Sequence, residues 1–324
     1  MTFNFEEFKQ KVHRKMGIKI EESDFDYERI TMNTAKRLLD PLIPHAARKM
    51  GITSNRMRER LINFQIDEHL YIEGRARGEN NWETFEISVS WGLLMFHYRM
   101  ASLIVSRMNI VDDNQNVVEE TTISTQKTTA IARNLLAAFW RENPVKALKQ
   151  SDNISIMHLG KGQLELAAYL VHHADCFVIS HELGHILINS NPECVKKELM
   201  IVEGARESML IPYLKTIEFD QDKEKDILDN WQNEIAADFI GTRLCLELGH
   251  NDITKMATYS SAILSLIMCN MLEMTYNRYT GKNFDYTTHP PCQLRLDFLQ
   301  TISNWHDDLS DSFRQLSYFI LSQI

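Results

Sequence analysis

The sequence predicts an α+β fold that is predominantly helical and contains one small β-sheet. Three long segments, 163–189, 224–248 and 253–280, have the apolar content and spacing of helices that pack into a core. Residues 68–95 differ, because two segments rich in β-forming residues flank the turn signal GENN at 78–81. We therefore expect a β-hairpin among helices. A chain of 324 residues, 44% of them hydrophobic, is long enough for one large core or two modest ones.

Residues 1–66 are expected to form a helical N-terminal region. Helical apolar spacing is found at 3–16 and at 27–39. Ser54 is expected to cap a further helix that runs to about Ile66. We interpret this region as a cover on the core, with partner binding or substrate selection as the alternative.

The hairpin is expected to be followed by a helix at 95–110 and by another that begins near Ser124. The segment NISIMHLG at 153–160 is a candidate strand, and His158 within it is interpreted as structural or solvent-facing. The remaining helices are expected at 193–214 and 307–322.

The helix predicted at 163–189 carries the pattern HELGH, from His181 to His185. Four residues of a helix bring both imidazoles to one face, where they can hold Zn²⁺ at about 2.0–2.1 Å. Glu182 lies beside them and can take a proton from a water bound to the metal. Gly184 costs helix stability, and we expect it to keep the backbone clear near the metal. The alternative is a chance match with two core histidines bonded to carbonyl groups.

A catalytic zinc ion needs a third protein ligand and keeps one position open. The best candidate is Glu234 in NEIAAD, because an acid among apolar residues is rarely buried without a partner. Asp238, one turn further along, can accept the free N–H of a ligand histidine, most simply His181. The alternative is a solvated acidic face. The rival third ligands are His172, His173, Glu203 and His289.

The patterns HELGH, NEIAAD and HPPCQLR follow one another along the chain. Their order resembles that of the gluzincin zinc peptidases of the CaaX-prenyl-protease and HtpX type, which have an HExxH helix, an NExxAD-like helix and an HPxxxxR-like segment. A weaker likeness is FEISVSWGLL at 85–94. The resemblance implies a zincin-like metallopeptidase core, with the small sheet beside the HExxH helix. It also implies Zn²⁺ as the cofactor, held by His181, His185 and Glu234.

By the same resemblance, residues 67–324 form the zinc metallopeptidase domain, with an insertion at about 95–160. The resemblance also implies that His289 stabilises a developing oxyanion and that Arg295 pairs with Asp238 or its surroundings. The alternative for the HPP segment is a rigid turn that begins a helix.

The amino-acid composition limits which binding partners and which cellular compartment we expect. The net charge is −9 and no basic patch stands out, so a nucleic-acid partner is not expected. The five cysteines never form a CxxC pair, which favours a reducing compartment. The most apolar run, 256–274, is interrupted by polar residues and fits a buried helix better than a membrane span. We expect a soluble, cytoplasmic protein without the membrane helices usual in the family.

The sequence therefore predicts a zinc-dependent endopeptidase that hydrolyses a protein or peptide substrate, with Glu182 as general base. The alternative is a non-catalytic, zinc-stabilised interaction or regulatory protein with the same fold. In that case Cys194 or Cys292 would fill the fourth zinc position, because thiolates bind zinc well.

Overall fold

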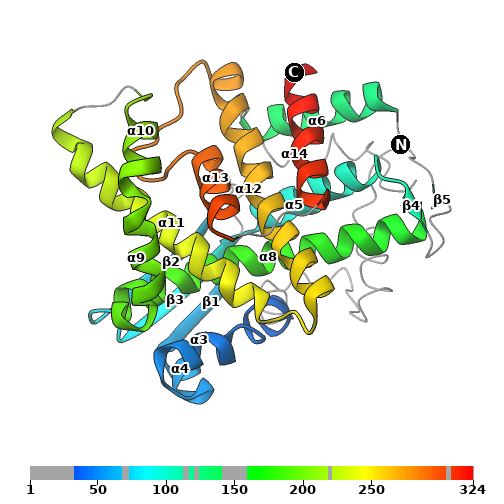
Figure 1. Ribbon diagram of the computed structural model, residues 1–324. Helices are drawn as coiled ribbons and strands as arrows, with labels where there is room; N and C mark the ends of the chain where they lie inside the picture. Colours follow the sequence, from blue (N-terminus) through cyan, green and yellow to red (C-terminus); the bar gives the residue numbers. More distant parts are fainter. Residues whose placement is uncertain are drawn as a thin grey trace.

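Helix α8, Lys161–Ser190, lies at the centre of the described fold (Figure 1). Helices α5 (Trp91–Val105), α11 (Glu224–Leu246) and α12 (Asp252–Thr280) pack against it, and so does the sheet through strand β2 (Gly74–Glu79). One continuous hydrophobic core extends through these elements. The predicted class, predominantly helical α+β, is confirmed.

The structure is a computed structural model that describes residues 33–67, 73–111, 117–119, 124–140, 159–217, 221–303 and 308–323. Residues 153–158 of the strand expected at 153–160, with His158, lie outside the described residues, and 159–160 are not in a strand. The helix expected at 3–16 and the first part of the one expected at 27–39 also lie outside the described residues. None of the described helices combines the length and hydropathy needed to cross a bilayer.

The sheet beside α8 has three strands in the order β1-β3-β2. Strand β3 (Thr84–Ser90) pairs antiparallel with β2, so the predicted hairpin is confirmed. Strand β1 (Leu61–Asp67) runs parallel to β3 on its other side. As a result β2 is an edge strand, and its free edge faces the C-terminal half of α8.

The helix expected from Ser54 to about Ile66 is wrong in its second half. Helix α4 covers Ser54–Arg60, its cap is the side chain of Thr53 and not Ser54, and β1 follows directly. Because β1 pairs with β3 along most of its length and buries Ile66, tertiary pairing outweighs local helix preference here. The division expected between residues 66 and 67 falls inside this strand.

The helix expected at 95–110 begins and ends earlier. The side chain of Ser90 accepts a hydrogen bond from the backbone N–H of Leu93 at 3.2 Å, so α5 begins at Trp91. Most of α5 is buried. Part of the expected insertion at 95–160 is therefore a core helix.

The other predicted helices are present, with the segment expected at 193–214 divided into short helical pieces. The remaining elements are η2 Ala35–Leu39, α3 Ile43–Met50, β4 Ile110–Val111, β5 Val117–Glu119, α6 Thr125–Trp140, η5 Pro192–Val195, α9 Lys196–Gly204, η6 Arg206–Leu210, α10 Ile211–Leu214, η7 Gln221–Lys223, α13 Cys292–Ser303 and α14 Asp308–Gln323.

Candidate metal centre

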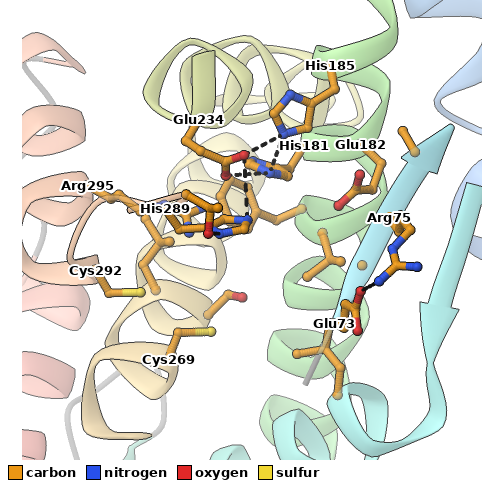
Figure 2. A pocket seen from close by; sticks show the side chains of 18 of the residues that line it. Glu73, Arg75, His181, Glu182, His185, Glu234, Cys269, His289, Cys292 and Arg295 are labelled. Carbon is orange, nitrogen blue, oxygen red and sulfur yellow. Dashed lines mark hydrogen bonds and ion pairs between the residues drawn. The ribbon is translucent and has the colours of Figure 1, made fainter. Parts of the chain in front are cut away.

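Two imidazoles and one carboxylate converge where α8 crosses α11 (Figure 2). The Nε2 atoms of His181 and His185 are 3.1 Å apart, and His185 Nε2 is 3.2 Å from Glu234 Oε1. His181 Nε2 is 3.5 Å from Glu234 Oε2. A tetrahedral zinc site with ligand bonds of about 2.0–2.1 Å has edges of about 3.3 Å. The separation of the two imidazole nitrogens, and the distance from each of them to one oxygen of Glu234, lie on both sides of that value, so the two histidines and the carboxylate are close enough to share one small cation.

The hydrogen bonding of Glu234 also fits a metal ion. Its side chain is largely buried, and Oε2 has no hydrogen-bond partner among the described residues. A buried carboxylate oxygen without a partner is unfavourable. The donor set of two histidines and one glutamate is one that catalytic zinc ions use. The residues present therefore fit Zn²⁺.

A second set of contacts orients the first histidine. His181 Nδ1 lies 2.8 Å from Asp238 Oδ1, and Asp238 is fully buried. Arg295 donates from Nε and Nη2 to the two oxygens of Asp238, both at 2.6 Å. Because the ionised Asp238 only accepts, His181 carries its proton on Nδ1 and leaves the Nε2 lone pair for a cation. These contacts agree with the pairing expected for Asp238 and Arg295.

The electrostatics of the centre favour positive charge. Burial opposes a charged imidazole at His181, but the adjacent carboxylates of Asp238 and Glu234 outweigh it and raise the pKa of His181 to about 10. Burial also opposes ionisation of Asp238, yet the Arg295 guanidinium holds the pKa of that carboxyl below its usual value. A site that stabilises a proton so strongly when empty of metal also attracts a divalent cation.

Two glycines allow α8 and α11 to approach closely enough to bring the ligands together. A Cβ atom on Gly184 would lie 2.7 Å from the carbonyl oxygen of Ala237 on α11. A Cβ on Gly241 would lie 2.7 Å from the backbone nitrogen of His181. The sequence-based reason for Gly184, clearance near the metal, is therefore wrong. Its backbone is clear of the neighbouring helix instead.

Glu182 lies beside the ligand group, against the edge strand β2. It is buried, and its carboxylate accepts a hydrogen bond from the backbone N–H of Ala76. A Cβ on Gly74 would lie 2.7 Å from Glu182 Oε1, so the bare backbone of β2 makes room for this carboxylate. Burial raises the pKa of Glu182, although His181 and His185 act in the opposite direction. A carboxylate with raised basicity is suited to accepting a proton.

His289 stands on the open side of the centre, in the loop before α13 (Figure 2). Its Nε2 is 3.7 Å from Glu234 Oε1, its Nδ1 is 2.8 Å from Thr288 Oγ1, and its side chain is 58% exposed. The structure thus brings it next to the ligands without placing it in their group. Among the described residues, none of the rival ligands His172, His173, Glu203, Cys194 and Cys292 belongs to that group either.

A cavity of about 720 Å³ opens over the centre. Strand β2 borders one side of it through Gly74, Arg75 and Ala76, together with Glu73 just before the strand. The opposite side is a recess whose walls come from α5, α6, α12 and the loop before α13. The cavity is therefore large enough for several residues of a peptide next to the ligand group.

Sequence reasoning missed three contributors to this site. The sequence predicts Gly74 and Ala76 only as residues of the hairpin, and no short-range signal shows that their backbone faces Glu182. Glu273 was taken as an interruption of an apolar run, but it lines the cavity. An acid in an otherwise apolar helix was the signal that could have indicated it.

No protein-family model matches the chain, and no match is found among curated proteins or solved structures. The family resemblance therefore depends on the motif residues and the geometry of their side chains.

Proposed function

We propose that this chain is a zinc-dependent endopeptidase with a zincin-like core. The observation that carries the proposal is the convergence of the Nε2 atoms of His181 and His185 on each other and on the two carboxylate oxygens of Glu234, at 3.1 to 3.5 Å, with the buried Glu182 beside them. A structural zinc site has no use for a carboxylate in that place. Zinc, when bound, would polarise a substrate carbonyl and make a water molecule acidic enough to attack it at neutral pH.

The side chains have separate tasks in this proposal. Glu182 accepts the proton of the attacking water and passes it to the leaving amine, and its buried setting favours this exchange. Asp238, held by Arg295, keeps His181 in the tautomer whose Nε2 faces the ligand group. His289 lies on the solvent side, where its imidazole can donate to the charge that develops on the carbonyl oxygen.

Strand β2 offers a place for the substrate backbone. It is an edge strand, it borders the cavity, and the N–H of Ala76 points away from β3 toward Glu182. Backbone groups alternate in direction along an antiparallel strand, so those of Gly74 and Gly78 face the same way. An extended peptide can add to such an edge.

The alternative, a zinc-stabilised protein without activity, finds no specific support among the described residues. That alternative expects a closed site with a thiolate ligand, but the ligand group contains no cysteine and a large cavity opens over it. Glu182 would also be a costly buried acid with no task.

Glu182→Gln tests the proposal. We expect the variant to bind one zinc ion per chain like the wild type and to lose cleavage by about 10²–10⁴-fold, as for loss of a general base. Metal analysis and fragment mapping of a protein mixture provide the two measurements, with Glu207→Gln, an exposed acid on η6, as the matched control. Wild-type protein that binds no zinc, or full activity of Glu182→Gln, would contradict it.

A further inference from the structure

The recess opposite β2 contains a carboxylate without a cationic partner. Glu273 on α12 lines the cavity, and its Oε2 accepts a hydrogen bond from the backbone N–H of Cys292 at 2.8 Å. No ion pair joins Glu273 to a lysine, arginine or histidine within the described part of the chain. The structure therefore holds this acid in place without a cation from the described ranges in direct contact, and Arg295 acts on it only from a longer distance.

The cations that line the same cavity are already engaged. Arg295 directs two hydrogen bonds at Asp238, and Arg75 forms an ion pair with Glu73 on the strand side. On the recess side Asp285 adds a second acid at the exposed rim. The recess therefore carries net negative charge even when the metal ligands are left out of account.

The walls of the recess are apolar. Leu93, Phe177, Leu266 and Leu272 line it from three helices, and Trp140 and Phe284 add aromatic surface. The two aromatic rings lie edge to face, with centroids 6.5 Å apart, and Trp140 Nε1 donates to the carbonyl oxygen of Leu272 at 3.0 Å. Fixed apolar walls around one acid suit a side chain with a long aliphatic stem and a cationic head.

The recess also lies at the right place relative to the metal centre. Glu273 contacts the first residue of α13, Cys292, and Asp238 contacts Arg295 one turn later on the same helix. Figure 2 shows Cys292 and Arg295 next to each other on the side of the centre opposite Arg75 and Glu73. A substrate strand on β2 would therefore direct alternate side chains toward this recess.

We propose that this recess binds the side chain of a lysine or arginine of the substrate, with Glu273 as its ion-pair partner, which rests on the peptidase function proposed above. The negative net charge of the chain favours approach of such basic segments. Burial raises the pKa of Glu273 to about 7, and the hydrogen bonds from Cys292 and the more distant Arg295 guanidinium offset this only in part. Glu273 thus acts as a specificity-determining residue, and it does not take part in bond cleavage.

The first test is a cleavage profile. A peptide library with internal lysine and arginine residues is treated with zinc-loaded wild type, Glu273→Gln, Glu273→Lys and the control Glu207→Gln. We expect wild type and control to cleave preferentially at one fixed position relative to a basic residue. Glu273→Gln should lose this preference by about tenfold or more, as for loss of a hydrogen bond to a charged group, while still cleaving neutral sequences. An unchanged profile in Glu273→Gln would overturn the proposal.

The second test does not depend on cleavage. Binding of fluorescent peptides that differ only in one lysine, alanine or glutamate is measured with zinc-loaded Glu182→Gln, alone and combined with Glu273→Gln. The lysine peptide should bind about tenfold more tightly, and Glu273→Gln should remove the difference. Equal binding of the three peptides, or binding that acetylation of the peptide N-terminus abolishes, would contradict a side-chain site. If the wild type cleaved no peptide but the lysine peptide still bound selectively, the peptidase function would be refuted and the proposed side-chain site would stand.

Discussion

Helix α8 takes part in two buried histidine–aspartate contacts that differ in what the second imidazole nitrogen meets. In one, His97 Nδ1 lies 2.8 Å from Asp175 Oδ1, and His97 Nε2 lies 3.0 Å from Ser265 Oγ. In the other, His181 Nδ1 meets Asp238 at the same distance, but its Nε2 faces another imidazole and a carboxylate.

This difference separates a structural histidine from a ligand. The first contact is complete, because both ring nitrogens of His97 have a partner that fits either a donor or an acceptor. The second is incomplete, because a hydrogen bond at Nε2 of His181 cannot satisfy His185 and both oxygens of Glu234 together. An acceptor beside His181, Glu234 Oε2, is thus left without a hydrogen-bond partner among the described residues, whereas both ring nitrogens of His97 have one. Four predictions test this distinction, in order of decreasing expected effect.

The largest expected effect is the loss of unfolding free energy when the His97–Asp175 pair is disrupted. His97→Ala leaves the buried Asp175 carboxylate without its partner, which is expected to cost about 3–5 kcal/mol of unfolding free energy. The loss should be the same with and without zinc in urea unfolding. His181→Ala is the matched comparison, and its loss should be larger with zinc than without zinc, because only the zinc-bound protein also loses a metal ligand. If the loss of unfolding free energy in His97→Ala changed with zinc, the distinction between the two histidine–aspartate pairs would be wrong.

The His97–Asp175 pair should also make the free energy of unfolding depend on pH. Burial opposes the charge on His97, but its hydrogen bond with Asp175 outweighs this and raises the pKa from 6.5 to about 9. The folded state therefore holds a proton that the unfolded state releases, so the stabilisation is fully present below pH 6.5 and is lost as pH rises through 9. The change amounts to as much as about 3 kcal/mol.

Unfolding free energies measured between pH 6 and 10 check this prediction. Because Cys269 also contacts His97, the series is run in a Cys269→Ala background, with and without His97→Gln. We expect a steeper downward slope when His97 is present, because the raised pKa of His181 contributes equally to both proteins. Parallel curves for the two proteins would show that His97 folds in its neutral form.

The His181–Asp238 pair should determine how tightly the centre binds zinc. Asp238→Asn removes the charge that orients His181 and is expected to weaken zinc binding by about 10–100-fold. Competition with a chelator of known affinity measures the change. Asp175→Asn is the matched control on α8 and should leave zinc affinity as in the wild type, although it lowers stability. Equal loss of affinity in both variants would mean that the two pairs are coupled.

The smallest expected effect is on the proposed cleavage, from a substitution that shifts Glu182 and leaves both histidine–aspartate pairs intact. Gly74→Ala places a methyl group against Glu182 Oε1 and should reduce cleavage on the order of tenfold, because small misplacements of a reacting group are costly. Zinc content and unfolding free energy should stay close to wild type, since the displaced atom is the end of a side chain. A loss of zinc in this variant would instead place Gly74 among the supports of the ligand group.

The fold class and most helices could be predicted from the sequence because they depend on local signals. Asn251 and Gly281 begin and end α12 as capping chemistry predicts, and the spacing of His181 and His185 follows from helix geometry alone. The prediction of a helix from Ser54 to Ile66 was wrong in its second half, because that half pairs with β3 and strand pairing does not depend on local sequence.

By itself, then, the sequence determined which helices carry the candidate ligands and which side of each helix those ligands share. Only the tertiary structure decided that Glu234 reaches the histidines, that Asp238 binds both His181 and Arg295, and that Glu182 lies against β2. The reason is physical: positions one turn apart follow from helix rise, whereas the approach of α8 to α11 depends on close backbone packing at Gly184 and Gly241.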